Sequence, residues 1–176
     1  ARLYIVDLNG GGVDRTAVDT VDPTRSQARI MFSDTPAERL GDNGWDLLEK
    51  IQDRAAVLMA FEQVGGAEVA LDMAKEYALD RYAFGRPIAS YQAIKHRLAD
   101  MYIQIELARS NSYYGAWALS IDAAELSVAA ATARVSATEA YNFASKENIQ
   151  IHGGMGFTWE FNCHLYYRRS RQLALS

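Results

Sequence analysis

The stretch Tyr77-Ala-Leu-Asp-Arg-Tyr-Ala-Phe-Gly-Arg-Pro-Ile-Ala-Ser-Tyr-Gln92 ends one long helical pattern and begins another. Gly85 breaks a helix at little cost, and Pro87 fixes φ at a value that suits the first turn of the next helix. Arg81 and Arg86 therefore lie on either side of a tight corner, where a guanidinium and the free N–H groups of a helix start both suit an anion. The spacing alone favours an ordinary helical hairpin with solvated arginines, so both interpretations stand at this point.

Helical periodicity extends from this corner in both directions. From about Gly44, apolar residues recur every three or four positions: Ile51, Ala55, Leu58, Phe61, Val64, Ala67, Leu71, Ala74 and Ala78. A second helix, over about 90–119, has the stripe Ile94, Leu98, Met101, Ile105, Ala108, Ser112, Gly115 and Leu119. Asp42 or Asn43 is suited to cap the first helix. The pair Gly65-Gly66 within that helix indicates close packing of another helix, or of a ligand.

Two further helices complete the pattern. Asp122 and Glu125 have the spacing of a capping box, and an Ala-rich helix follows to about Asn148. A shorter helix is expected over about 160–173. Together the four helices predict an up-and-down four-helix bundle over residues 42–176.

Residues 1–41 have a different pattern. Leu3–Val6, Val18–Val21 and Ala28–Phe32 are short β-branched or aromatic runs, separated by turn signals at Gly10-Gly-Gly12 and Asp22-Pro23. Three short strands make a marginal sheet, so we interpret this segment as the remnant of a larger β-domain. The expected fold class is α+β and mainly α.

Composition narrows the class of protein. The chain has 176 residues, 49% of them hydrophobic, a net charge of −4 and one cysteine, Cys163. The negative charge argues against nucleic acid as the main partner, and a single cysteine fits a reducing compartment. No apolar run reaches the length of a membrane span, and no leader pattern opens the chain. We therefore expect a cytoplasmic protein, and the absence of Met at position 1 suggests that the sequence starts inside a longer chain.

The residue identities add a resemblance to a known family. Arg81-Tyr-Ala-Phe-Gly-Arg-Pro-Ile, followed by Tyr91-Gln92 and Leu98-Ala-Asp-Met101, resembles the helical C-terminal domain of the acyl-CoA dehydrogenases. A second block, Ile149-Gln-Ile-His-Gly-Gly-Met-Gly-Phe-Thr-Trp-Glu160, resembles the other flavin-contacting loop of that family. The resemblance runs from about Asp42 to the end of the sequence. It implies that residues 1–41 are part of the family's middle β-domain and that residues 42–176 are its C-terminal bundle.

The resemblance also implies a cofactor and its contacts. The residues that match the family's FAD contacts are Arg81, Ala83, Phe84, Gln92, Gln150, Gly153 and Gly154. Arg81 is expected to pair with the pyrophosphate, since a guanidinium suits its geometry. At the position of Ala83, many family members have a hydroxyl residue that can hydrogen-bond to the flavin. Ala83 has no hydroxyl group and cannot make this hydrogen bond. Without the resemblance, the glycines are equally consistent with a plain helix stop.

The family reaction needs a carboxylate base, which removes a proton from the α-carbon of an acyl-CoA thioester while hydride leaves the β-carbon for the flavin. The base position of most members falls just beyond Ser176, and that of a minority falls on Ala55. Asp53 is two residues away and points elsewhere on a helix, although it matches a position near the CoA-binding end and is a candidate substrate contact. Glu160 is interpreted as a cap or brace for the last helix, with a catalytic role as the weaker alternative. The catalytic base is therefore unknown.

Other residue clusters have plain interpretations. His152, Cys163 and His164 fit no standard set of metal ligands, so no metal is expected. The basic aromatic tail over residues 166–171 indicates a solvated or interface helix face, with a phosphate patch as the weaker alternative.

Three hypotheses remain. The first is an FAD-dependent acyl-CoA dehydrogenase, in which the resemblance implies a dimer or tetramer built through the bundle and an electron-transfer protein as acceptor. The sequence after the glycine loop looks most similar to bacterial members that act on bulky acyl-CoA, some of which are heteromers. The second is a flavin-binding relative that lacks the dehydrogenase base, such as an oxidase. The third is a non-catalytic helical oligomerisation module.

Overall fold

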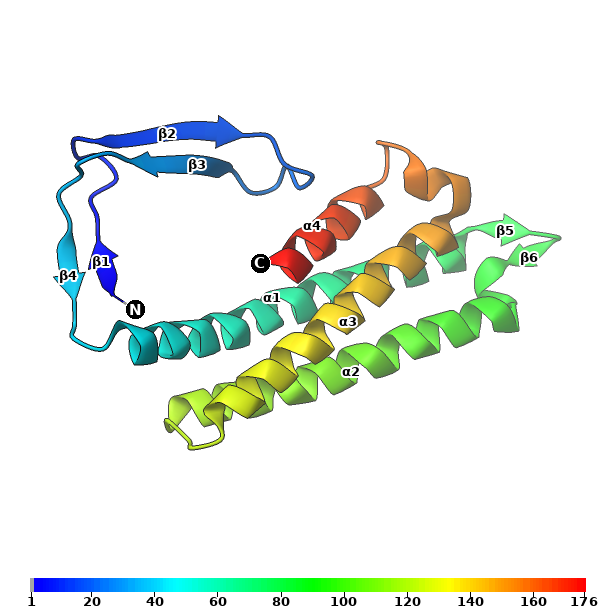
Figure 1. Cartoon of the computed structure of the whole chain (residues 1–176). Coiled ribbons are helices and arrows are strands. Elements are labelled where there is room, and N and C mark those ends of the chain that lie inside the picture. Colours follow the sequence, from blue (N-terminus) through cyan, green and yellow to red (C-terminus); the bar gives the residue numbers. More distant parts are fainter. Residues whose placement is uncertain (1) are drawn as a thin grey trace. The chain divides into compact units, whose positions relative to one another are not determined.

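The computed structural model describes residues 2–176. The chain separates into two compact units, Ala1–Gln52 and Asp53–Ser176. Each unit is described by itself, and Figure 1 labels their elements.

The first unit contains two antiparallel strand pairs. β1 (Leu3–Ile5) pairs with β4 (Glu38–Leu40), and β2 (Val13–Val18) pairs with β3 (Gln27–Phe32). The prediction of a strand over residues 18–21 was wrong, because β2 ends at Val18 and starts directly after the glycine turn. Its polar residues reflect a ribbon that is exposed on both faces, which an apolar pattern does not reveal.

Four helices dominate the described part of the chain. α1 spans Gly44–Asp80, α2 spans Gln92–Ser120, α3 spans Leu126–His152 and α4 spans Cys163–Leu175. The 3₁₀ turns η1 (Ile88–Ser90) and η2 (Gly153–Phe157) precede α2 and follow α3. α1 and α3 run in the same direction, and α2 and α4 run against them (Figure 1). The predicted α+β, mainly helical fold with an up-and-down bundle is confirmed.

The core of the second unit is made largely of alanine. The fully buried alanines come from α1, α2 and α3: Ala60, Ala67, Ala70, Ala74, Ala78, Ala108, Ala118, Ala129, Ala130, Ala133, Ala137 and Ala144. Larger buried side chains, among them Met101, Ile105 and Tyr141, fill the remaining space. Small side chains let helix axes approach closely, so this bundle is held by tight packing of helix against helix.

Gly66 shows how close the helices are. A Cβ built on Gly66 would lie 2.5 Å from the ring of Tyr141 in α3, whereas a Cβ on Gly65 meets nothing within 4 Å. The predicted close helix packing therefore explains Gly66 and leaves Gly65 unexplained.

The buried residues match the predicted apolar stripe in α2 but not in the first half of α1. In α2 the residues that are buried include Met101, Ile105, Ala108, Ser112 and Gly115, as predicted. In the first half of α1 the predicted stripe was wrong: Leu58 is exposed, and Val57 and Ala60 are buried in its place.

Two predicted helix starts also differ from the structure. Glu125 occupies the cap position of α3 without a side-chain hydrogen bond, and Asp122 has φ 51° in the preceding turn, so there is no capping box. Pro87 precedes the short turn η1, and α2 begins only at Gln92.

Candidate functional site

The corner between α1 and α2 is a small β-hairpin. β5 (Tyr82–Ala83) pairs with β6 (Arg86–Pro87), and the turn places Phe84 at φ 53° and Gly85 at φ 79°. The hydroxyl of Tyr91 donates to the Ala83 carbonyl at 2.8 Å. The guanidinium of Arg86 lies 4.0 Å from the centroid of the Tyr91 ring. Tyr91 thus fixes the shape of the hairpin from both strands, a role that the sequence did not indicate.

Three of the four side chains predicted to contact FAD at this corner face solvent, and Ala83 is partly buried. Arg81 and Gln92 are exposed, and the Phe84 ring is 98% exposed. Within residues 2–176, Arg81 forms no ion pair. The guanidinium of Arg86, in contrast, stacks on the Tyr91 ring. The two arginines of the corner therefore differ in whether the guanidinium has a partner. A free guanidinium and an exposed apolar ring at the same corner are suited to an anion that carries a flat organic group.

The glycine block closes α3 as predicted. α3 ends at His152, and Gly153 adopts φ 60°. Cβ atoms built on Gly153 or Gly154 would meet nothing within 4 Å, whereas one on Gly156 would lie 2.6 Å from the Ile149 carbonyl oxygen. Gly153 and Gly154 therefore leave backbone open to a ligand, and Gly156 is needed for packing of the loop on itself.

A cluster of three aromatic rings joins the two blocks. His152, only 4% exposed, stacks on Tyr77 of α1 with ring centroids 4.2 Å apart. The Phe161 ring makes T-shaped contacts with both rings, and its centroid lies 5.9 Å from that of Tyr77 and 5.3 Å from that of His152. The peptide N–H of Arg81 donates to the Tyr77 carbonyl at 2.9 Å. The corner and the glycine block therefore lie at the same end of the bundle, as Figure 1 also shows.

The protonation state of His152 follows from its surroundings. Its Nδ1 lies 2.9 Å from the Asn148 carbonyl oxygen, which requires a proton on Nδ1. Burial lowers the pKa of His152 below its usual 6.5, and the hydrogen bond to Asn148 only partly offsets this. The ring is therefore neutral at neutral pH.

A second link joins α2 to α3 at this end. Arg97, near the start of α2, pairs with the buried carboxylate of Glu147 in α3. Three chain segments thus converge here: the end of α1, the start of α2 and the end of α3.

A groove of about 520 Å³ adjoins the glycine block, between the end of α3 and α4. Gln150 lines it, together with the cationic side chains of Lys146, Arg168 and Arg171. Trp159 forms part of the wall, and the Arg168 guanidinium lies 4.9 Å from its ring centroid. Among the described residues that line the groove there is no carboxylate. Its chemistry suits an anion with a planar group.

Comparison with known proteins identifies the family. The sequence pattern described as "Acyl-CoA dehydrogenase, C-terminal domain" matches residues 42–175. The chain belongs to the acyl-CoA dehydrogenase family. Acyl-CoA dehydrogenase IpdE2 of Mycobacterium tuberculosis is 45% identical over 155 residues, which are 87% of this chain and 44% of that protein. The chain thus spans about half the length of the curated relatives it matches.

Solved structures of the family have the same fold. Butyryl-CoA dehydrogenase from Megasphaera elsdenii superimposes with a TM-score of 0.91 at 28% identity, over 98% of this chain and 46% of that one. The ChsE4–ChsE5 complex from Mycobacterium tuberculosis gives a TM-score of 0.89 at 27% identity, over 98% of this chain and 47% of the other. The prediction of a four-helix bundle of the acyl-CoA dehydrogenase C-terminal type is therefore confirmed.

The candidate substrate contact lies apart from the residues predicted to contact FAD. Asp53 is near the start of α1, where it accepts a hydrogen bond from the Ser127 hydroxyl at 2.7 Å. At 1.5 Å per residue, α1 places it about 40 Å from the corner along the helix axis. Ala55 is exposed and offers no carboxylate. Glu160 is exposed too, and the cap position of α4 is Asn162, so the predicted brace by Glu160 is not seen.

The remaining clusters hold no metal-like arrangement. Across residues 2–176 there is no group of three His, Cys, Asp or Glu side chains placed to bind a metal ion. Cys163 is buried, and desolvation raises the pKa of its thiol. No helix in the described part of the chain is long and apolar enough to cross a membrane.

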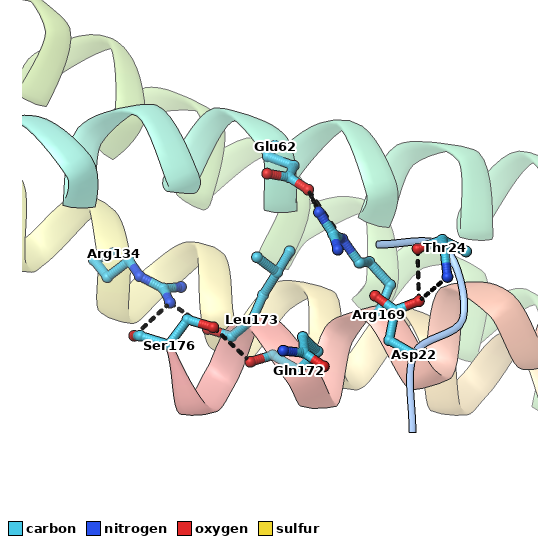
Figure 2. A network of polar contacts seen from close by, with 8 residues as sticks. All are labelled: Asp22, Thr24, Glu62, Arg134, Arg169, Gln172, Leu173 and Ser176. Carbon is cyan, nitrogen blue, oxygen red and sulfur yellow. Dashed lines mark hydrogen bonds and ion pairs between the residues drawn. The ribbon is translucent and has the colours of Figure 1, made fainter. Parts of the chain in front are cut away.

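Two arginines fasten α4 to the rest of the bundle. Arg169 of α4 pairs with Glu62 of α1. Arg134 of α3 donates to the Leu173 carbonyl and, at 3.4 Å, to the carbonyl oxygen of Ser176, as Figure 2 shows. The basic tail was predicted to be a solvated or interface helix face. The structure divides it, because Arg169 faces inward and Arg168 lines the groove.

Proposed function

We propose that this chain contributes FAD contacts to an acyl-CoA dehydrogenase, an enzyme that removes hydrogen from the α- and β-carbons of an acyl-CoA thioester. The observation that carries the proposal is the convergence of the two family blocks at one end of the bundle, joined by the stack of Tyr77 on His152. Separate surface features would not require such a link.

Each proposed contact has a role that its exposure permits. Arg81 binds the pyrophosphate, because its guanidinium is exposed and forms no ion pair in the described part of the chain. Backbone N–H groups at Gly153 and Gly154 approach the ligand where no Cβ intervenes. Gln92 and Gln150 supply amide hydrogen bonds, and the Phe84 ring supplies an apolar surface. FAD, when bound, supplies the hydride acceptor.

Residues 1–176 contain no carboxylate at either position where family members have the catalytic base. Ala55 has no acid group, and the other position falls beyond Ser176. We propose that the base comes from outside these residues, either from the same polypeptide or from a partner subunit. A heteromer has a precedent among the structural neighbours, since ChsE4–ChsE5 is a complex of two proteins. The acyl-CoA substrate, the assembly through the bundle and an electron-transfer protein as acceptor are parts of the same proposal.

The domain division is also a proposal. We assign residues 1–41 to the middle β-domain and residues 42–176 to the C-terminal bundle. The family pattern begins at residue 42, and both faces of the β2–β3 ribbon are exposed, which suits a fragment of a larger sheet.

A second candidate function keeps the flavin and omits the dehydrogenation. Ala55 in place of an acid favours a flavin-binding relative that lacks the base. The helical oligomerisation module, which binds no flavin, has no observation in its favour beyond the bundle itself.

The deciding measurement is made on the full-length, untagged protein with any subunit that co-purifies. Its mass, subunit composition and flavin content are determined on one sample. One chain type with one flavin per chain supports a dehydrogenase that carries its own base. Two chain types that share flavin place the base in the partner, and activity with acyl-CoA then separates the dehydrogenase from the base-less relative. A protein that has no flavin and takes up none leaves the oligomerisation module.

Arg81→Met should weaken flavin binding strongly, because it removes charge-assisted hydrogen bonds worth about 1.5–3 kcal/mol, equivalent to about ten- to hundredfold in Kd. Arg54→Met is the matched control, since Arg54 is an exposed arginine of the same helix outside the corner. Kd is measured by flavin fluorescence during reconstitution of the apoprotein. Equal affinities of the two variants would remove Arg81 from the site.

A further inference from the structure

We propose that His152 is a positioning residue that holds the two flavin-binding blocks in register by clamping the ring of Tyr77. The inference rests on the proposed function, because it concerns how that FAD site is assembled. It assigns a role to a side chain that matches no flavin contact carried over from the family.

Only a few bonds separate the two stacked rings from the hairpin corner on one side and from the glycine block on the other. On one side, His152 is the last residue of α3 and is bonded directly to Gly153, the first open glycine. On the other side, the Tyr77 carbonyl accepts the N–H of Arg81 at 2.9 Å, so a shift of Tyr77 moves the start of the hairpin. The ring stack, with centroids 4.2 Å apart, thus connects the helix that ends at the arginine with the helix that ends at the glycines.

The His152 ring is held in one orientation. Its Nδ1–H donates to the Asn148 carbonyl one helical turn earlier, at 2.9 Å. The Phe161 ring, from the segment before α4, packs against both His152 and Tyr77 in a T-shaped arrangement. A ring fixed by a hydrogen bond and two aromatic neighbours is a rigid spacer between α1 and α3.

The cluster offers a protonated imidazole little compensation. The groups packed against His152 are Tyr77 from α1, Asn148 from α3 and Phe161 from the segment before α4, and none of them is a carboxylate. The carboxylate next along α3 from this turn, Glu147, is already paired with Arg97 of α2. Burial accordingly lowers the pKa of His152.

The sign of the pH effect follows from linkage. The clamped state favours the neutral ring, and the open state has the ordinary pKa near 6.5. The contribution of the clamp is therefore complete above about pH 6.5 and is lost as the pH falls through the lower pKa of the clamped state. Flavin affinity should fall on the acid side of this range, in parallel with the clamp.

The experiment measures the Kd of FAD between pH 5 and 8 on the reconstituted full-length assembly. His152→Phe keeps a flat ring on Tyr77 and cannot titrate, so it should bind within about threefold of wild type at pH 7.5 and lose the acid-side weakening. His152→Ala removes the spacer and should raise Kd about tenfold or more across the whole range. His96→Gln, at an exposed histidine of α2, should keep the wild-type pH profile.

A stability control separates positioning from general unfolding. Leu126→Ala lies in the small buried cluster at the start of α3, at the opposite end of the bundle, and should lower the Tm without changing the Kd of FAD. His152→Ala should lower the Tm and raise the Kd.

The outcomes distinguish the inference from the proposal beneath it. If the wild-type assembly binds no FAD at any pH, the proposed function is wrong and the clamp falls with it. If the wild type binds FAD but His152→Phe retains the acid-side weakening, or His152→Ala binds as tightly as wild type, the clamp is overturned and the proposed function stands.

Discussion

At the scale of single residues, the adjacent glycines Gly65 and Gly66 have opposite surroundings. Gly66 faces the Tyr141 ring, and Gly65 faces open space. Both are helical, so both carry the same intrinsic cost relative to alanine. Any difference between their alanine variants therefore reports packing alone.

Gly66→Ala should destabilise the protein by about 1–3 kcal/mol, because its Cβ would overlap the Tyr141 ring and the core would have to move. Gly65→Ala should stabilise it by about 0.5–1 kcal/mol through helix propensity. Urea unfolding followed by circular dichroism measures both. A stabilised Gly66→Ala variant would mean that the α1–α3 contact is looser than described.

At this scale, the sequence predicted only those site residues that belong to a recognisable motif. The FAD contacts were assigned from two motifs, and those motifs do lie at one end of the bundle. His152 was considered only as a metal ligand, because its partner Tyr77 belongs to a different helix and no local spacing joins the two. A stack between distant helices has no periodic signal in one sequence.

At the scale of elements, α4 is attached by polar groups in addition to buried apolar side chains such as Leu173. Arg134 binds carbonyl oxygens at its C-terminal end, and Arg169 pairs with Glu62 of α1 (Figure 2). The last carbonyls of a helix have no partners within the helix, so an arginine from a neighbour satisfies them and fixes the helix end.

Arg134→Met should free the last turn of α4, since it removes hydrogen bonds worth about 1–2 kcal/mol from that turn. Amide hydrogen exchange at Gln172–Ser176 should accelerate about tenfold, while exchange in α2 stays unchanged. Arg171→Met is the control, because Arg171 stacks on Tyr167 within α4 itself. Unchanged exchange in the Arg134 variant would show that apolar packing alone holds α4.

Element prediction succeeded best for the second helix. The predicted stripe of α2 was correct for Met101, Ile105 and Ala108, which follow one another at helical spacing and are buried. The first half of α1 is apolar on more than one face, so periodicity gives an ambiguous phase there, and Leu58 was placed wrongly. The capping box failed because Asp122 is in a left-handed turn, which its sequence spacing does not reveal.

At the scale of the whole molecule, α2 presents an apolar stripe to solvent. Its exposed members recur at helical spacing: Ile103, Leu107, Tyr114 and Trp117, followed by Ile121 at the cap position directly after the helix. Large contiguous apolar surfaces on a helix are typical of interaction sites. This stripe supports the proposed assembly through the bundle.

Leu107→Glu should therefore shift the protein to a smaller species in sedimentation velocity, because a buried, unpaired carboxylate opposes association. Flavin content should fall with it if neighbouring subunits share the cofactor. Ala131→Glu, at an exposed position of α3, is the control. An unchanged sedimentation coefficient in the Leu107 variant would exclude this face from the interface.

The alanine core has a consequence for how such a chain can diverge. An alanine at a helix contact cannot shrink except to glycine, and any larger side chain forces the axes apart. Most core positions of the bundle therefore tolerate almost no substitution. A leucine core differs, because its volume can be redistributed among several residues. Divergence within this bundle should accordingly concentrate on its outer faces, where partners and ligands are recognised, while its interior changes slowly.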